Sequence, residues 1–434
     1  MKDKVRLNFV VFGDESSGKS TLAGMVVNLL LGAITRQHLE SAEQNAINNG
    51  DQSLKFSRVI DDRADSEEDV NIDSFAVLLR RCQFSPFFLW IDAPDPAAWF
   101  AYADTAILVI SATYDLGNGI QIHSPIFQQL ISASALGLRE IIVAVNKMDA
   151  IGWNEDRWNE FLKEFRRVIK KAGFDDRATV VVPVSGYNGD NILEDSATMP
   201  WYRGWAVTRH DGSTTERGKT LSDAIEISNL SERRPNDPLR LLIDDVYETD
   251  DSDTIANCYV VAGTVDSGIE LRNPAGDSAE VESLSLVTTG NNDAGYPGDF
   301  IACTLTNMSG CFTKGQVVGN AAEDEFSYAT SFTARVVITG KDYQIYPGYR
   351  YTLCGLFNTA CEFSTLLCTV NPRNGNTIVD SPEFIKTGNT AIVDVVPDNP
   401  IFVENIQSGS RFARFVIEDE GEIIGMGIIK SVEY

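Results

Sequence analysis

The sequence predicts a multidomain protein of the α/β plus all-β class, in which a mostly parallel sheet precedes β-barrels. Its 434 residues are enough for roughly three domains. The front part alternates strand-like and helix-like runs. After Leu221, short runs rich in Val, Ile, Thr and Tyr are broken by Gly, Pro, Asn and Asp, with no long helical period. The first pattern is typical of an α/β sheet and the second of barrels.

The α/β part shows strands and helices in the order that a parallel sheet with helices on both faces requires. Strands are predicted at residues 7–12, 75–79, 87–91, 106–111, 141–145 and 179–184. Helices are predicted at residues 20–32, 126–138 and 158–172. Phe161, Phe165 and Ile169 place apolar side chains at helical spacing in the last of these.

Two polar segments divide the chain into predicted domains. Residues 231–238 contain two arginines, two prolines and two acidic residues, and residues 321–325 are largely acidic. Exposed, polar and proline-rich segments are typical of linkers between domains. We therefore predict an α/β domain at 1–235 and all-β domains at 236–322 and 323–434.

A phosphate-binding loop follows the first predicted strand. Gly13-Asp14-Glu15-Ser16-Ser17-Gly18-Lys19-Ser20 has the spacing G-x-x-x-x-G-K-S and lies between a strand and a helix. Backbone N–H groups of such a loop point at phosphate oxygens, the lysine reaches the terminal phosphates, and the serine hydroxyl binds Mg²⁺. The predicted phosphate-binding residues are Gly13, Asp14, Glu15, Ser16, Ser17, Gly18, Lys19, Ser20 and Thr21.

A second nucleotide motif, Asn146-Lys147-Met148-Asp149, follows the predicted strand 141–145 at the carboxyl edge of the sheet, where ligands bind. Asn146 can bond the O6/N7 edge of guanine, the Lys147 stem can cover the ring, and the Asp149 carboxylate can accept from N1–H and the 2-amino group. Adenine presents no such paired donors, so a guanine nucleotide is expected. The turn at Ser185, Gly186 and Tyr187 is expected to form the third side of the base-binding site, with its backbone N–H groups directed toward the base oxygen.

Composition limits the partners and the compartment. The net charge is −26. Residues 1–235 carry 25 Lys and Arg against 33 Asp and Glu, and residues 236–434 carry 11 against 29. Such an acidic second part is poorly suited to neutralising nucleic-acid phosphates, so DNA is not expected and tRNA and the ribosome are disfavoured.

No apolar run approaches the ~18 residues of a membrane span, and no leader is visible, so a cytoplasmic protein is expected. The seven cysteines show no C-x-x-C spacing, which favours buried thiols over disulfides or a metal site.

The chain resembles eukaryotic elongation factor 1-alpha, a translational GTPase family. The resemblance rests on the loop at residues 13–20, on residues 145–149, and above all on residues 182–191 with Met199-Pro200-Trp201-Tyr202-Arg203-Gly204-Trp205, and it continues to residues 427–430. It implies a P-loop NTPase G domain followed by two β-barrels, GTP or GDP with Mg²⁺ as cofactors, and aminoacyl-tRNA carriage to the ribosome. Ser20 and Asp92 would hold the Mg²⁺, and Asn71 stands where the family has a Mg²⁺-binding threonine.

The departures from the family are concentrated in its switches and tRNA-binding segments. The second switch of the family reads Asp-Ala-Pro-Gly-His, but here it is Asp92-Ala93-Pro94-Asp95-Pro96. Proline has no N–H to donate and no imidazole to orient water. The first switch is replaced by an acidic run at residues 61–73, and residues 263–268 and 354–359 lack the basic and histidine residues of the family. The predicted set of catalytic residues is therefore empty.

Three functions remain open at this point. The first is a guanine-nucleotide-binding paralogue with weak or absent GTP hydrolysis and poor tRNA binding, which acts as a protein-binding regulator or scaffold. The second is an active elongation GTPase that delivers aminoacyl-tRNA. The third is a structural subunit that binds no nucleotide.

Overall fold

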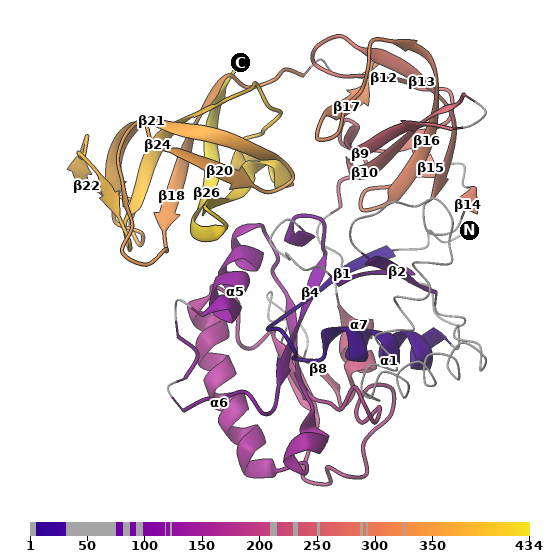
Figure 1. Cartoon of the computed structure of the whole chain (residues 1–434), viewed down its shortest axis with the longest axis vertical. Helices are drawn as coiled ribbons and strands as arrows, with labels where there is room; N and C mark the ends of the chain where they lie inside the picture. Colours follow the sequence, from indigo (N-terminus) through magenta and orange to yellow (C-terminus); the bar gives the residue numbers. More distant parts are fainter. Residues whose placement is uncertain are drawn as a thin grey trace. The chain divides into compact units, whose positions relative to one another are not determined.

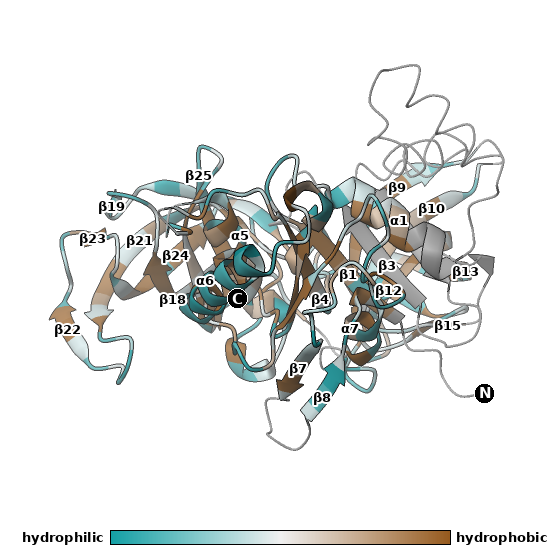
Figure 2. Ribbon diagram, turned by 90° about the horizontal axis from the view of Figure 1, so that it is seen from below, coloured by the Kyte–Doolittle hydropathy of each residue, from teal (hydrophilic) through white to brown (hydrophobic). Residues whose placement is uncertain are grey.

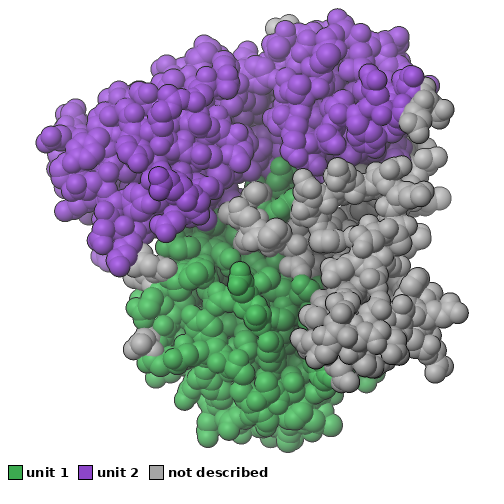
Figure 3. Space-filling view, viewed as in Figure 1, with its two compact units in different colours: residues 1–134, 138–231 green, residues 135–137, 232–434 purple. Residues whose placement is uncertain are grey.

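The computed structural model describes residues 6–31, 75–80, 87–92, 99–117, 119–121, 124–208, 215–228, 233–249, 252–286, 290–291, 294–323 and 326–434. The chain forms two compact units, residues 1–134 with 138–231 and residues 135–137 with 232–434 (Figure 3). The division at Ser231 lies beside the predicted limit at residue 235, which stays a prediction. Among the described residues, no helix is both long and apolar enough to cross a membrane.

The first unit contains a six-stranded sheet in the order β2-β3-β1-β4-β5-β6 (Figure 1). Its strands are β1 Arg6–Phe12, β2 Phe75–Arg80, β3 Phe87–Asp92, β4 Thr105–Ser111, β5 Ile141–Asn146 and β6 Val180–Pro183. Every neighbouring pair is parallel except β2 and β3, which are antiparallel. The predicted mostly parallel sheet is confirmed.

The helices of this unit are α1 Lys19–Leu31, α5 Pro125–Ala135, α6 Glu155–Lys171 and α7 Leu221–Ile227. Helix α6 buries Trp158, Phe161 and Phe165 on one face, and Figure 2 colours much of its remaining surface as hydrophilic. It begins before the predicted residue 158 because the Asn154 side chain accepts a hydrogen bond from Arg157 N at 2.8 Å and caps the first turn.

The change in sequence pattern after Leu221 does not mark the end of the α/β unit. Residues 221–227 form α7, and its capping box satisfies the first turn: Asp223 N donates to Thr220 Oγ1, and Thr220 N donates to the Asp223 carboxylate, both at 3.0 Å. A hairpin of β7 Trp205–Thr208 and β8 Thr215–Gly218 precedes it. Leu221 and Ile225 pack into the same core as β1, β4 and β5.

The second unit contains two β-barrels, as predicted. In the first, the strands β9 Arg240–Glu248, β10 Thr254–Ala262, β12 Glu270–Arg272, β13 Ser278–Leu286, β16 Phe300–Ser309 and β17 Val317–Asn320 form a sheet that closes through β12 and β13. Strand β14 Gly290–Asn291 extends β13, and β11 Val265–Asp266 pairs with β15 Ala294–Gly295.

In the second barrel, the strands β18 Ser331–Ile338, β20 Arg350–Cys354, β21 Asn358–Val370, β24 Thr390–Pro397, β25 Arg414–Asp419 and β26 Glu422–Glu433 close through β20 and β21. Strand β22 Thr377–Asp380 adds to β21 outside this closed set, and β19 Gln344–Ile345 pairs with β23 Ile385–Lys386. Burial alternates along β18, which is the period-2 pattern of a strand with one face in the core.

No cysteine in the described part of the chain forms a disulfide. Cys258, Cys303, Cys354 and Cys361 are buried, as predicted, whereas Cys368 is half-buried and Cys311 is exposed. The expectation of burial is therefore wrong for Cys311. Cys82 lies outside the described residues.

Candidate nucleotide-binding site

The predicted nucleotide-binding segments come together at one edge of the sheet. The loop at residues 13–18 follows β1, Asn146 ends β5, and Ser185 follows β6. Because β1, β4, β5 and β6 run parallel, their carboxyl ends lie at the same edge (Figure 1). This is the edge at which open α/β sheets bind ligands.

The two glycines of the loop are required by its backbone. Gly13 has φ 139° and Gly18 has φ 88°, values that residues with a Cβ rarely adopt. A Cβ on Gly13 would lie 2.0 Å from Val109 O, and one on Gly18 would lie 2.5 Å from Asn146 Nδ2. The loop therefore packs directly against β4 and the end of β5.

Lys19 is the first residue of α1 and folds back over the loop. Its Nζ donates to Gly13 O at 3.1 Å and to Asp14 O at 2.9 Å. Ser17 Oγ is buried and bonds to no other group in the described part of the chain. An ammonium group and an unsatisfied hydroxyl inside a loop at a helix N-terminus fit a phosphate anion.

Asn146 has a different contact from the one expected. Its side-chain amide donates to Ser17 O at 3.0 Å, and its Oδ1 accepts from Gly186 N at 2.8 Å. The side chain is buried. It therefore joins the phosphate-binding loop to the loop after β6, and the Gly186 N–H that was expected to face the base oxygen is used inside the protein.

Lys147 and Asp149 make two further links between the loops. Lys147 adopts φ 62°, and its Nζ donates to Ser16 O at 2.6 Å. Ser185 Oγ donates to Asp149 Oδ1 at 2.6 Å and accepts from Asn188 N at 3.1 Å. Asp149 is half-buried and a carboxylate has about four lone-pair sites, so it retains acceptors for a base. The Tyr187 side chain is 46% exposed.

The residues expected to hold Mg²⁺ are partly within the described structure. Ser20 lies in the first turn of α1, and Asp92 ends β3 beside Val11 of β1, just before the loop. The Ser20 hydroxyl lies at this sheet edge, and a hard cation such as Mg²⁺ prefers oxygen ligands. Asn71 lies outside the described residues, as do residues 93–98 of the altered second switch.

Asp14 gives the loop an unusual electrostatic character. Burial raises the pKa of its carboxyl group, and the Lys19 charge lowers it by a smaller amount. Burial raises the pKa of Tyr114, and the negative charges of Asp14 and Asp115 raise it further by smaller amounts, so the Tyr114 hydroxyl lies in the field of the Asp14 carboxylate. Sequence reasoning missed Tyr114 because no motif connects it with the loop.

We expect Asp14→Asn to strengthen GDP binding at pH 7.5 by roughly threefold to tenfold, because it removes a half-exposed, solvent-screened negative charge near the phosphates. In the native protein a bound phosphate raises the Asp14 pKa further, so binding takes up a proton and affinity increases as pH falls. Titrations with a fluorescent GDP analogue between pH 7.5 and 5.5 measure this. Protonation of the nucleotide affects the native protein and Asp14→Asn equally, so the variant is the control for it. If the affinity for GDP changes equally with pH in both proteins, Asp14 is not the group that takes up the proton.

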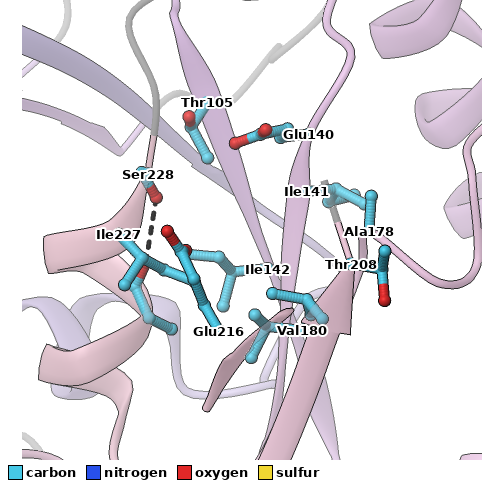
Figure 4. A pocket seen from close by; sticks show the side chains of 12 residues that line it. Thr105, Glu140, Ile141, Ile142, Ala178, Val180, Thr208, Glu216, Ile227 and Ser228 are labelled. Carbon is cyan, nitrogen blue, oxygen red and sulfur yellow. Dashed lines mark hydrogen bonds between the residues drawn. The ribbon is translucent and has the colours of Figure 1, made fainter. Parts of the chain in front are cut away.

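A small cavity at the opposite edge of the sheet is not a second nucleotide site. It has a volume of about 20 Å³ and is lined by residues at the start of β4, β5 and β6, by β7 and β8, and by α7 (Figure 4). Glu140 and Glu216 are among the side chains around it. A cavity of this size holds about one water molecule.

The fold and the site define a class of protein. A phosphate-binding loop after β1 and an Asn-Lys-x-Asp segment after β5 form a guanine-nucleotide-type G domain, and the two following barrels are the architecture of a translational GTPase. The family model for the elongation factor Tu GTP binding domain matches residues 4–228, and that for the GTP-eEF1A C-terminal domain matches residues 331–430. The chain belongs to the elongation factor 1-alpha family of translational GTPases.

Full-length relatives agree with this. Elongation factor 1-alpha of Blastobotrys adeninivorans is 35% identical over 445 residues, covering 100% of this chain and 95% of the relative. The protein of the same name from Mucor circinelloides f. lusitanicus is also 35% identical, with 100% and 96% coverage. The resemblance expected from the motifs is confirmed, and family membership supports guanine-nucleotide binding.

Solved structures show the same fold at lower identity. The S. cerevisiae Ski7 GTPase-like domain bound to GDP and inorganic phosphate has a TM-score of 0.74 at 17% identity, covering 98% of this chain and 97% of that chain. Translation elongation factor SelB from Methanococcus maripaludis, in complex with the GTP analogue GppNHp, has a TM-score of 0.65 at 14% identity, covering 100% and 80%.

Proposed function

We propose that this family member binds GDP or GTP, hydrolyses GTP slowly or not at all, and acts in the cytoplasm as a nucleotide-stabilised regulator or scaffold for protein partners. The proposed nucleotide binding is supported by one observation: direct hydrogen bonds join the phosphate-binding loop, the segment after β5 and the loop after β6. Asn146 joins Ser17 to Gly186, Lys147 bonds Ser16, and Ser185 bonds Asp149. A site held together in this way is preorganised for its ligand.

The proposed loss of hydrolysis rests on the sequence of the second switch. Lys19 can stabilise charge on the transferring phosphoryl group, and Mg²⁺ held by Ser20 and Asp92 would neutralise the phosphate oxygens. Orienting the attacking water is a separate task. The segment Asp92-Ala93-Pro94-Asp95-Pro96 carries no imidazole for it, and Pro96 lacks an N–H.

The proposal of protein partners rests on charge. Residues 236–434 carry 29 acidic against 11 basic residues. Binding of tRNA depends on clustered Lys and Arg that neutralise phosphates, and affinity falls by several powers of ten when about six such contacts are lost. An acidic surface instead suits neutral or basic protein surfaces.

The nucleotide carried by the purified protein tests the proposal. After denaturation in acid, chromatography of the supernatant should show GDP or GTP at close to one per chain, and a large GTP fraction would indicate slow hydrolysis. Mg·GTP added to nucleotide-depleted protein should raise the unfolding midpoint, because ligand binding to the native state stabilises it. A protein that carries no nucleotide and shows no such rise would be the structural subunit instead.

An active elongation GTPase is the second candidate, because the 35% identity to elongation factor 1-alpha extends over the whole chain. Filter binding with aminoacyl-tRNA and single-turnover GTP hydrolysis with ribosomes distinguish the two. We expect no GTP-dependent tRNA retention and a hydrolysis rate near the uncatalysed background. Brisk ribosome-stimulated turnover would establish the second candidate.

A further inference from the structure

Strand β22 lies outside the closed second barrel. The barrel closes between β20 and β21, and among the described strands β22 pairs with β21 alone. All four of its residues, Thr377–Asp380, are exposed, and it projects from the end of β21 in Figure 1. Closing a barrel removes strand edges, so β22 gives this barrel an open edge that closure alone would not leave.

This edge is apolar. The Ile378 side chain is 64% exposed and that of Val379 is 49% exposed, and Figure 2 colours β22 as hydrophobic. Natural edge strands are usually protected by lysine, proline or a bulge that turns the edge away. The sequence Thr-Ile-Val-Asp carries one charge, at its end, and its β-branched residues favour strand pairing. One register shift interrupts its pairing with β21, between Thr377 and Val379.

A backbone donor on β22 is available to a new strand. Val379 N donates to Thr369 Oγ1 at 3.2 Å, and Ser381 N donates to Leu367 O at 2.9 Å, so both point toward β21. Successive N–H groups of a strand point to opposite sides. The amide of Asp380 lies between these two residues and therefore points away from β21, on the side where an added strand would bond. The register with β21 shifts at Ile378, so the alternation does not extend to its amide.

A groove lies beside the edge. It has a volume of about 400 Å³ and lies between β22, the end of β21 and residues 382–390. Pro372, Pro382 and Phe384 provide apolar walls next to the two exposed aliphatic side chains. It is large enough for one or two side chains of a strand that is paired with β22.

We propose that β22 is the docking edge for an extended segment of a partner protein, aliphatic at alternate positions and neutral to basic in charge. An outward backbone donor on an exposed, apolar edge strand is complemented by an added strand. The charge of the chain selects the kind of strand: with a net charge of −26, acidic partners and a second copy of the chain are repelled. Glu383 and Lys386 both line the groove, so the groove itself is close to neutral, and Asp380 adds an acidic group at the end of β22.

A labelled ten-residue peptide of alternating valine and lysine tests this on the full-length protein. We expect saturable binding by fluorescence anisotropy and slower hydrogen exchange over residues 376–381, measured by mass spectrometry. A matched peptide of alternating valine and glutamate should bind much more weakly. Equal binding of the two peptides would overturn the charge assignment.

Two variants locate the site, and a third is the control. Ile378→Ser should weaken binding by roughly tenfold or more, because burial of an aliphatic side chain contributes a factor of this order. Asp380→Pro removes one outward N–H and keeps the apolar side chains, and it should weaken binding as well. Val396→Ser, at a residue of β24 that is 40% exposed, should bind as the native protein does.

Unchanged binding by Ile378→Ser and Asp380→Pro would overturn the proposal. So would a concentration-dependent dimer in sedimentation that Ile378→Ser abolishes, because it would assign the edge to a second copy of the chain. None of these measurements uses nucleotide, so their outcome is independent of the proposed nucleotide binding.

Discussion

Replacing Lys19 with alanine should lower the affinity for GDP and GTP by a factor of about 100 or more. The Lys19 ammonium is held above the loop by Gly13 O and Asp14 O, at the position where the motif places terminal phosphates. Each charge-assisted hydrogen bond contributes about 1.5–3 kcal/mol, and two of them account for the factor. Titration with a fluorescent GDP analogue measures the change.

One further variant separates the charge of Lys19 from its packing, and a second, at another lysine, is the control. Lys19→Gln keeps N–H donors for the loop carbonyls and loses only the charge, so it should bind nearly as weakly as Lys19→Ala. Lys163→Ala removes an exposed lysine of α6 and should leave the affinity unchanged. If Lys19→Ala binds GDP within a factor of about three of the native protein, the loop does not hold phosphate as the motif indicates.

The sheet and its long helices could be predicted because their signals are local. Strand β4 is a continuous apolar run, and α6 repeats its apolar residues at helical spacing. Helix α7 was missed because its seven residues give too short a period, although the pattern Thr220-x-x-Asp223 of its capping box was visible. That β22 lies outside the barrel depends on how strands pair, which no local pattern specifies.

The place of the predicted site residues in the fold could be predicted, but not all of their contacts, and their binding of nucleotide stays a prediction. The spacing of the loop and of residues 146–149 placed both at one sheet edge, and the structure brings them together. The motif relates Asn146 to a base, whereas in the structure its side chain bonds to Ser17, 129 residues away. Such a contact exists only after β1 and β5 have taken their places in the sheet.

Asn146→Ala should lower the free energy of unfolding of the α/β unit by about 2–4 kcal/mol. It leaves the buried Gly186 N–H and Ser17 O without partners, and each unpaired buried group costs about 1–3 kcal/mol. All six tryptophans lie between residues 90 and 205, so tryptophan fluorescence during urea unfolding reports on this unit. Asn159→Ala, at an exposed position on α6, should change little.

A ligand that has phosphates but no base shows whether Asn146 contributes to phosphate binding or only to base binding. Because its amide holds Ser17 O of the phosphate-binding loop, Asn146→Ala should weaken binding of tripolyphosphate as well as GDP. Asp149→Ala removes the acceptor for the base and should weaken GDP while leaving tripolyphosphate nearly unchanged. If Asn146→Ala behaves as Asp149→Ala does, Asn146 acts on the base alone and its bonds to the two loops contribute nothing to phosphate binding.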